Sequence, residues 1–441
     1  MIPAPARAAV GVIRISGKDS LEIVSRLFPA YKKLAPNKAV YGNLVFENEV
    51  LDSCIITYFK APHSYTGEDV IEISCHGSIG VLSSVIEALI HFGCRQAAGG
   101  EFTKRAFLNG KLDLTQAEAV MELIDSTTKL EQKAASAHLG GKTFNAIEQI
   151  RSDMLDIASS LSAYVDYPDE EIEELSYNNI EEALLRAKAQ TDKLYESSLC
   201  GKVIKEGVRC AILGRTNAGK SSLMNLLSGF KRSIVTDIEG TTRDIVEQTV
   251  EIGGVKLILS DTAGLRETEN EVEQIGIEMS KDMANSASLC LCVFDLSREL
   301  NSEDIMLEEI TKASPRIAVF NKTDLEVKAD IKELEEKFLH KVYISAKEDQ
   351  TAQGLASIIK DMFLAGLPQD GNAILSLRQQ SQLKIMQEEL QGAIDALHLG
   401  FTLDAVGICI DNVIAAAGEI TGKSVTEDTV HRIFERFCVG K

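Results

Sequence analysis

One loop, Gly214-Arg-Thr-Asn-Ala-Gly-Lys-Ser221, constrains this chain more than any other feature. It follows the apolar run Val208–Leu213 and precedes Leu223-Met-Asn-Leu-Leu227, which has helical character. A strand that enters a helix through such a loop turns backbone N–H groups toward bound phosphates, so this context favours nucleotide binding over a glycine turn without a ligand. Lys220 should reach the β- and γ-phosphates, and Ser221 should offer its hydroxyl to Mg²⁺.

The region around this loop predicts a mostly parallel, buried sheet. Helical segments separate its short apolar runs, as expected when strands alternate with crossover helices. The runs are Val208–Leu213, Val255–Ser260, Leu289–Asp295, Arg316–Phe320 and Val342–Ser345. We therefore expect an α/β domain over residues 207–365.

The base of the nucleotide is indicated by Asn321-Lys-Thr-Asp324, which follows the run Arg316–Phe320. The Asp324 carboxylate can accept both hydrogens that guanine carries on N1 and N2, whereas adenine would leave this carboxylate unpaired. Such a tetrapeptide alone can be a surface turn, but with the phosphate loop it predicts GTP. Ser345-Ala-Lys347, after the last run, would support the base.

Two further segments are typical of GTPase switch regions. Asp261-Thr-Ala-Gly264 would hold the Mg²⁺ shell through Asp261 and sense the γ-phosphate through Gly264. Thr242, in Gly240-Thr-Thr-Arg-Asp244, would complete the Mg²⁺ contacts. In the expected order, these segments and the three motifs above predict a GTPase domain.

Two positions leave the mechanism of hydrolysis open. Leu265 stands where Ras-like GTPases have the glutamine that orients the attacking water. An acidic side chain of the following stretch could orient the water instead, although a mobile charged loop explains the same residues equally well. These residues are Glu267, Glu269, Glu271 and Glu273. Asn217 could help coordinate a monovalent cation in place of an arginine finger, or only make a hydrogen bond within the loop.

The chain of 441 residues is too long for one core, since single cores stop growing near ~250 residues. Residues 1–115 mix β-rich runs with an apolar helical stretch near 79–92, which predicts a small α+β domain. Thr115-Gln-Ala-Glu118 has the form of a capping box, so a helix should begin there, and helices should continue to about residue 198.

Apolar stripes at helical spacing lie on both sides of the α/β region. The first comprises Ile147, Ile150, Met154, Ile157 and Leu161, and the second Leu383, Met386, Leu390, Ile394 and Leu397. Each stripe must be buried against partner helices. The sequence therefore predicts a helical domain, residues 116–206 and 366–441, into which the α/β domain is inserted.

The formal net charge of −20 argues against a protein that coats nucleic acid through bulk positive charge. Residues 1–115 are nearly neutral, with 12 Lys or Arg and 11 Asp or Glu, so the acidity lies downstream. The nine cysteines contain no CxxC pair, and no run approaches the ~20 apolar residues of a membrane span. We expect a soluble protein of a reducing cytoplasm.

The chain ends in Cys438-Val-Gly-Lys441, which has the spacing of a prenylation signal. Gly440 is not aliphatic and Lys441 is not a usual last residue, so lipidation is disfavoured. Cys438 is then either a thiol nucleophile or a small residue packed at a helix end.

Taken together, these motifs and a GTPase domain inserted between helices resemble the MnmE (TrmE) family of tRNA modification GTPases over essentially the whole chain. Three N-terminal signatures carry the same resemblance: Val12-Ile-Arg-Ile-Ser-Gly17, Ser64-Tyr-Thr-Gly-Glu-Asp69 and Gly100-Glu-Phe-Thr-Lys-Arg-Ala-Phe-Leu-Asn-Gly-Lys111. The resemblance implies a multidomain fold of α/β and all-α parts. These parts are an N-terminal α+β folate-binding and dimerisation domain over 1–115, the helical domain, and the inserted Ras-like P-loop GTPase domain.

The family's site residues carry over by motif position. Arg14, Glu72, Lys111 and Lys441 would bind 5-formyl- or 5,10-methylene-tetrahydrofolate. Asn217, Thr236, Ile238 and Thr241 would surround K⁺ where the GTPase domains of two subunits meet. Glu273 would position the attacking water, and Cys438 would take part in or support the modification chemistry. The residues expected to contact GTP are Asn217, Ala218, Gly219, Lys220, Ser221, Ser222, Thr236, Asp237, Ile238, Glu239, Gly240, Thr241, Thr242, Asp261, Thr262, Ala263, Gly264, Asn321, Lys322, Thr323, Asp324, Ser345, Ala346 and Lys347.

The resemblance also implies a function. A homodimer, joined by an FAD-dependent MnmG-like flavoprotein in a heterotetramer, would add an aminomethyl or carboxymethylaminomethyl group to C5 of the wobble uridine of certain tRNAs. K⁺-stimulated pairing of the GTPase domains would drive GTP hydrolysis. The alternative is a regulatory or ribosome-assembly switch GTPase without one-carbon chemistry, which the lack of an RNA-binding GxxG module in the sequence disfavours.

Overall fold

The computed structural model describes residues 8–166, 177–229, 247–260, 281–348, 352–367, 376–435 and 437. The chain divides into two compact units. The first contains Met1–Met121, His138–Ala187 and Glu388–Lys441, and the second contains Glu122–Ala137 and Lys188–Gln387. In the described ranges, no helix has the length and apolar character needed to cross a membrane.

The first unit begins with a four-stranded antiparallel sheet in the order β1-β4-β3-β2. Its strands are β1 (Val10–Ser16), β2 (Ala39–Phe46), β3 (Glu49–Phe59) and β4 (Val70–His76). Helices α1 (Ser20–Leu27) and α2 (Ile79–His91) share a core with one face, where Ile13, Ile56 and Ile73 are almost fully buried. Because side chains alternate along a strand, Arg14 and Glu72 face the other side, where they stand opposite each other.

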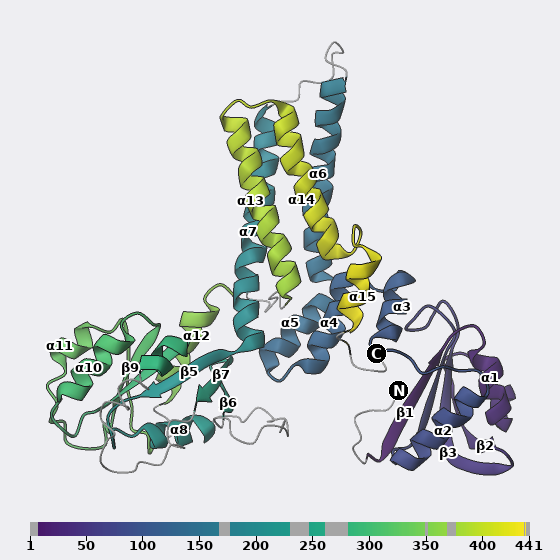
Figure 1. Ribbon diagram of the computed structural model, residues 1–441, viewed down its shortest axis with the longest axis horizontal. Helices are drawn as coiled ribbons and strands as arrows, with labels where there is room; N and C mark the ends of the chain where they lie inside the picture. The colour runs from purple at the N-terminus through teal and green to yellow at the C-terminus, as the bar shows by residue number, and fades with distance from the viewer. Residues whose placement is uncertain are drawn as a thin grey trace. The chain divides into compact units, whose positions relative to one another are not determined.

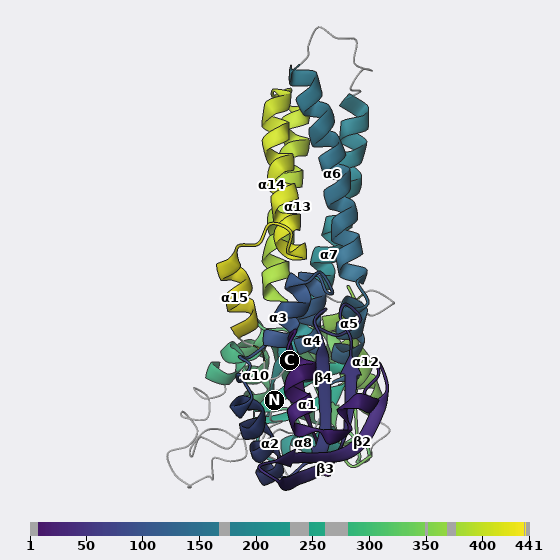
Figure 2. The ribbon, with the colours of Figure 1, turned by 90° about the vertical axis from the view of Figure 1, so that its right-hand side faces the viewer.

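Helices form the rest of this unit and continue into the second (Figures 1 and 2). They are α3 (Glu101–Leu108), α4 (Leu114–Asp125), α5 (Lys129–Leu139), α6 (Lys142–Asp166), α7 (Tyr177–Glu206), α13 (Leu377–His398), α14 (Leu403–Thr421) and α15 (Glu427–Glu435). α14 packs along α6, and the pairs Gln387–Asp192 and His398–Glu181 hold α13 antiparallel to α7. Most of both predicted apolar stripes is buried, with Ile147, Met154, Leu383 and Leu390 fully so, whereas Ile157 and Leu397 are only partly buried.

The predicted capping box at Thr115 is wrong by two residues. Helix α4 begins at Leu114, and the Asp113 carboxylate accepts from the Gln116 N–H at 2.9 Å. Gln116 Oε1 in turn accepts from the Asp113 N–H at 3.1 Å. Two overlapping segments have the form of a capping box, Asp113-Leu-Thr-Gln116 and Thr115-Gln-Ala-Glu118. In the structure, the first of them caps the helix, with Asp113 as the cap residue.

The second unit contains a six-stranded sheet in the order β10-β9-β8-β5-β7-β6. Its strands are β5 (Val208–Leu213), β6 (Glu247–Ile252), β7 (Val255–Ser260), β8 (Leu289–Asp295), β9 (Arg316–Asn321) and β10 (His340–Tyr343). The parallel pairing of the predicted strands is confirmed, and the sixth strand, β6, is an antiparallel edge strand in which Glu247 stands opposite Ser260. The apolar runs did not predict β6 because polar residues interrupt it.

Helices cover both faces of this sheet. α8 (Lys220–Gly229) and α12 (Ala352–Leu364) contribute apolar side chains to the core on one face. α10 (Ser302–Thr311) and α11 (Lys332–Glu336) contribute Leu307 and Leu334 to the core on the other. This layering leaves the carboxyl ends of the parallel strands at one edge, where ligands bind in open α/β sheets.

Candidate functional site

The phosphate loop connects the end of β5 to the start of α8. Asn217 and Gly219 have positive φ angles of 65° and 103°, which an asparagine tolerates and a glycine adopts freely. A Cβ atom on Gly219 would lie only 2.0 Å from Asn321 Nδ2, so glycine alone permits this close approach. Gly219, the second glycine of the motif, is thus needed for its close contact with Asn321 as well as for the turn.

Asn321, at the end of β9, joins three of the predicted motifs. Its side chain is 2% exposed and donates from Nδ2 to the Ala218 carbonyl oxygen at 2.9 Å. Its Oδ1 accepts from the Ala346 N–H at 3.0 Å. One buried amide therefore fixes the phosphate loop, the base motif and the base-supporting loop relative to one another.

Asp324 is exposed at the rim of this arrangement. Ser345 Oγ donates to Asp324 Oδ1 at 3.0 Å, and Lys347 Nζ lies 3.7 Å from Oδ2. The hydrogen bond from Ser345, with help from Lys347, lowers the pKa of Asp324, so its carboxylate is charged at neutral pH. A fixed, charged acceptor suits the paired donors of guanine.

The two lysines of the nucleotide motifs bind acceptors within the domain. Lys220 Nζ donates to the carbonyl oxygens of Gly214 at 2.6 Å and Arg215 at 3.1 Å, which draws the loop around its ammonium group. Lys322 has a φ of 68°, and its Nζ donates to Asp295 Oδ2 at 2.7 Å. Ser221 and Ser222 are exposed in the first turn of α8, where backbone N–H groups favour anions.

The remaining predicted residues of the switch regions and the C-terminus lie outside the described residues. They are Thr236, Asp237, Ile238, Glu239, Gly240, Thr241, Thr242, Asp261, Thr262, Ala263, Gly264, Glu273, Cys438 and Lys441. Among the described GTP candidates, the structure brings together Ala218, Gly219, Lys220, Asn321, Asp324, Ser345, Ala346 and Lys347.

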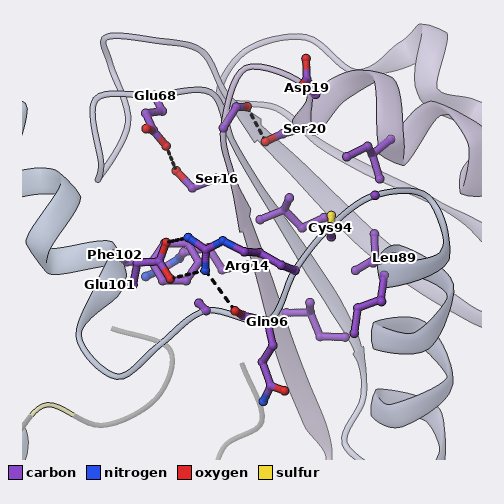
Figure 3. A pocket seen from close by; sticks show the side chains of 18 of the residues that line it. Arg14, Ser16, Asp19, Ser20, Glu68, Leu89, Cys94, Gln96, Glu101 and Phe102 are labelled. Carbon is purple, nitrogen blue, oxygen red and sulfur yellow. Dashed lines mark hydrogen bonds and ion pairs between the residues drawn. The ribbon is translucent and has the colours of Figure 1, made fainter. Parts of the chain in front are cut away.

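A cavity of about 390 Å³ lies in the N-terminal domain beside β1 (Figure 3). Its apolar wall comes from β1 and α2, including Ile13, Ile15 and Leu89. The polar wall comes from residues 93–97 and the start of α3. An apolar wall facing a rim of convergent polar groups is the usual form of a site for a small organic ligand.

A chain of charged side chains forms the polar wall. Arg95 and Arg105 both donate to Glu101, and Arg105 Nη1 also donates to Glu68 Oε2 at 2.8 Å. Ser16 Oγ donates to the same Glu68 oxygen at 2.8 Å. Burial raises the pKa of Glu101, but its hydrogen bonds with Arg95, the Ala98 N–H and Arg105 outweigh this and bring that pKa to about 2.

These members of the polar wall were not predicted as site residues. Glu68 belongs to the signature Ser64–Asp69, and Glu101 and Arg105 belong to the signature Gly100–Lys111. The signatures were visible in the sequence, but nothing in it showed that the two segments converge on one cavity.

The three described folate candidates do not form one cluster. Arg14 Nε and Nη2 donate to Glu72 Oε1 at 2.8 and 2.6 Å, and the two side chains are 22% and 28% exposed. Arg14 lines the cavity, and its guanidinium lies over the rings of Tyr65 and Phe102 at 5.4 and 5.7 Å. Lys111 lies apart from the cavity lining, with its Nζ donating to the Pro62 carbonyl at 3.1 Å.

The C-terminal segment contacts the start of the second signature. A Cβ atom on Gly99 would lie 2.5 Å from the Phe437 carbonyl oxygen, and one on Gly100 would lie 2.7 Å from that of Phe434. The rings of Phe434 and Phe437 pack with centroids 4.9 Å apart. Residue 437, which directly precedes Cys438, is therefore held against the segment that leads into the cavity wall.

Comparison with known proteins agrees with the sequence motifs. The family model of the MnmE helical domain matches residues 114–438, and that of the GTP-binding protein TrmE N-terminus matches residues 1–111. The chain is 39% identical to the tRNA modification GTPase MnmE of Thermoanaerobacter pseudethanolicus over 449 residues, which cover 99% of this chain and 97% of that protein. It is 37% identical to the protein of that name from Clostridioides difficile, with the same coverage of each chain.

Proposed function

The chain belongs to the MnmE (TrmE) family of tRNA modification GTPases, and from this membership we propose that it hydrolyses GTP to support modification of the wobble uridine of certain tRNAs. With an FAD-dependent MnmG-like flavoprotein, it would add an aminomethyl or carboxymethylaminomethyl group to C5 of that uridine. The observation that carries the GTPase assignment is Asn321, which ties Ala218 of the phosphate loop to Ala346 of the base-supporting loop.

We assign nucleotide binding to the described motifs. Backbone N–H groups of residues 217–222 and the Lys220 ammonium would hold the phosphates, and Asp324 would hold guanine. Ser221 is exposed at the start of α8, where its hydroxyl suits Mg²⁺, with Thr242 as the second ligand. When bound, Mg²⁺ would neutralise charge that develops as the γ-phosphoryl group leaves.

The hydrolytic step needs groups beyond these motifs. Asn217 is exposed in its left-handed turn, so its amide is accessible to a K⁺ ion held with Thr236, Ile238 and Thr241. When bound, this ion would supply the positive charge that an arginine finger supplies elsewhere. Glu273 would orient the attacking water.

The N-terminal cavity supports a folate site in part. Arg14, its partner Glu72 and the ring of Phe102 offer charge, hydrogen bonds and an aromatic face, which fit a planar heterocycle with an anionic tail. Lys111 and Lys441 complete the proposed set, and bound 5-formyl- or 5,10-methylene-tetrahydrofolate would supply the one-carbon unit. Cys438 is proposed to assist, because Phe437 before it contacts Gly99 at the edge of the cavity wall.

The quaternary and cellular assignments are also proposals. We propose a cytoplasmic homodimer that forms a heterotetramer with the flavoprotein, and a division into residues 1–115, 116–206, 207–365 and 366–441. The nearly neutral N-terminal domain and the flavoprotein are the better places to hold tRNA, because the remaining residues, with 34 Lys or Arg against 55 Asp or Glu, carry all of the negative net charge.

Deletion of the gene tests the proposed function. Mass spectrometry of tRNA nucleosides should show loss of the modified wobble uridine, and GTP hydrolysis by the purified protein should be faster in K⁺ than in Na⁺. Titration with 5-formyl-tetrahydrofolate should show binding that Arg14→Ala weakens. Unchanged nucleosides together with no folate binding would instead favour a switch GTPase without one-carbon chemistry.

A further inference from the structure

We propose that Arg215 and Asp304 form a positioning pair for the phosphate loop, so that GTP affinity depends on α10, a helix that carries none of the nucleotide motifs. The inference rests on the GTP binding proposed above. It assigns a role to two residues that the motif comparison leaves without one.

Arg215 is the second residue of the phosphate loop, and its side chain is directed to the start of α10. This side chain is 10% exposed, and its Nη1 lies 3.3 Å from Asp304 Oδ2. The same Nη1 donates to the Glu299 carbonyl oxygen at 3.1 Å. The backbone carbonyl of Arg215 accepts from Lys220 Nζ at 3.1 Å, so movement of this residue would displace an anchor of the phosphate-binding lysine.

Asp304 is fixed by its own helix. It is 1% exposed, and its Oδ2 accepts from the Asn301 N–H at 3.1 Å while Asn301 Oδ1 accepts from the Asp304 N–H at 3.2 Å. This reciprocal capping box holds the carboxylate at the first turn of α10. Arg215 is therefore anchored to a rigid support rather than to a mobile surface acid.

The Arg215–Asp304 pair is poorly suited to a purely stabilising role. Arg215 Nε and Nη2 and Asp304 Oδ1 are buried, and none has a hydrogen-bond partner among the described residues. Buried polar atoms without partners cost free energy, and apolar side chains of similar size often replace a buried ion pair without loss. An apolar pair at these two positions, however, would not hold the side chain of residue 215 in one fixed direction.

A second buried carboxylate, close enough to Asp304 to affect its pKa, binds a lysine of the base motif. Asp295, at the end of β8, is 1% exposed and binds Lys322 Nζ at 2.7 Å. Burial and the negative charge of Asp295 raise the pKa of Asp304, against the opposing effects of the Asn301 N–H and Arg215. Arg215 of the phosphate loop therefore pairs with Asp304, and Lys322 of the base motif pairs with the neighbouring Asp295.

The test replaces Asp304 and compares it with a matched residue of the same helix. Asp304→Asn keeps an acceptor for the Asn301 N–H and removes the charge that holds Arg215. The control, Glu308→Gln, changes another buried carboxylate of α10, which is 6% exposed and pairs with Arg316 at 3.1 Å. Arg316 begins β9, whereas Asn321 ends it, so this pair lies away from the nucleotide motifs. Affinity for a fluorescent GTP analogue and the urea midpoint of unfolding are measured for both full-length variants.

We expect Asp304→Asn to raise the Kd for GTP by about tenfold, within the usual range of coupling between sites, and Glu308→Gln to leave it within about twofold. The double variant Arg215→Met with Asp304→Leu should unfold at the urea midpoint of the wild type. Its affinity for GTP should nevertheless stay below that of the wild type. If Asp304→Asn fails to fold, Arg215→Lys, which keeps the charge but loses the planar fork, should raise the Kd by a smaller factor.

Two outcomes would overturn the inference. One is an unchanged Kd in Asp304→Asn, or in Arg215→Lys if that variant is the one that folds. The other is wild-type affinity in the apolar double variant. A wild-type protein that binds no GTP would contradict the proposed function instead, so the two failures are distinguishable.

Discussion

Asn321 Nδ2 donates to the carbonyl oxygen of Ala218 across 2.9 Å, so a side chain from β9 holds the phosphate loop that follows β5. The two residues are 103 positions apart in the chain. The segments proposed to bind the base and the phosphates therefore share one buried support.

Replacing Asn321 with alanine should weaken both stability and nucleotide binding. The change leaves the Ala218 carbonyl and the Ala346 N–H without their shared partner, at a cost of about 1–3 kcal/mol in the free energy of unfolding. We expect at least a tenfold rise in the Kd for GTP, roughly 1.4 kcal/mol or more, measured by fluorescence titration. Ser314→Ala, which removes one hydrogen bond to Ala284 elsewhere in the domain, should keep wild-type affinity. Equal affinity in the two variants would contradict the shared-support interpretation.

Gly219→Ala should abolish GTP binding. The new Cβ would lie 2.0 Å from Asn321 Nδ2, and the φ of 103° is one that alanine rarely adopts. Gly229→Ala, at the end of α8, is the matched control because its Cβ would meet no atom within 4 Å. Isothermal titration of both variants with GTP checks the prediction, and detectable binding by Gly219→Ala at near wild-type affinity would refute it.

The ion pairs of Glu101 should make the N-terminal domain sensitive to acid. Its pKa is about 2 in the folded chain against 4.5 ordinarily, so its contribution to stability is complete above about pH 4.5 and is lost as the pH falls toward 2. Because Arg95 is 67% exposed, solvent screening limits this contribution to roughly 1–2 kcal/mol. Urea unfolding of wild type and Glu101→Gln, followed from pH 7 to pH 3, should show a difference that is constant above pH 5 and shrinks below it. Glu22→Gln, at an exposed ion pair, should follow the wild type throughout.

Phe434→Ala should destabilise the first unit by about 3–5 kcal/mol, the usual cost of a buried phenylalanine. Phe434 lies between Phe107 and Phe437 and packs its backbone against Gly100. Its loss should therefore also loosen the start of α3 and weaken binding of 5-formyl-tetrahydrofolate. Leu399→Ala, at a side chain 72% exposed, should change neither property. Folate titration and urea unfolding of the two variants measure both effects.

The parallel strands, the helical stripes and the nucleotide motifs were predictable because each is a local pattern with a periodic or fixed spacing. Val208–Leu213 and Leu289–Asp295 are apolar throughout or nearly so, which is the signature of a strand buried on both faces. β6 was missed because an edge strand tolerates polar residues such as Gln248 and Thr249 beside buried ones such as Val250.

The cavity and the Arg215–Asp304 pair were not predictable, since both depend on contacts between distant segments. Ser16 and Glu68 meet across 52 positions, and Arg215 and Asp304 lie 89 positions apart in the numbering. No spacing rule connects such residues before the chain has folded. The capping box at Asp113 shows a different limit, because two overlapping local patterns fitted the same segment and only the structure distinguishes them.

The pairing of Glu247 with Ser260 has a consequence for any experiment that follows the nucleotide cycle. The chain enters this hairpin from the stretch that holds Thr242 and leaves it into the stretch that begins with Asp261. Because β6 and β7 pair along their whole length, a spectroscopic probe attached to either strand, for example at Thr249, cannot assign a change to one of the two stretches. Assigning it requires two labels, one ahead of residue 247 and one beyond residue 260.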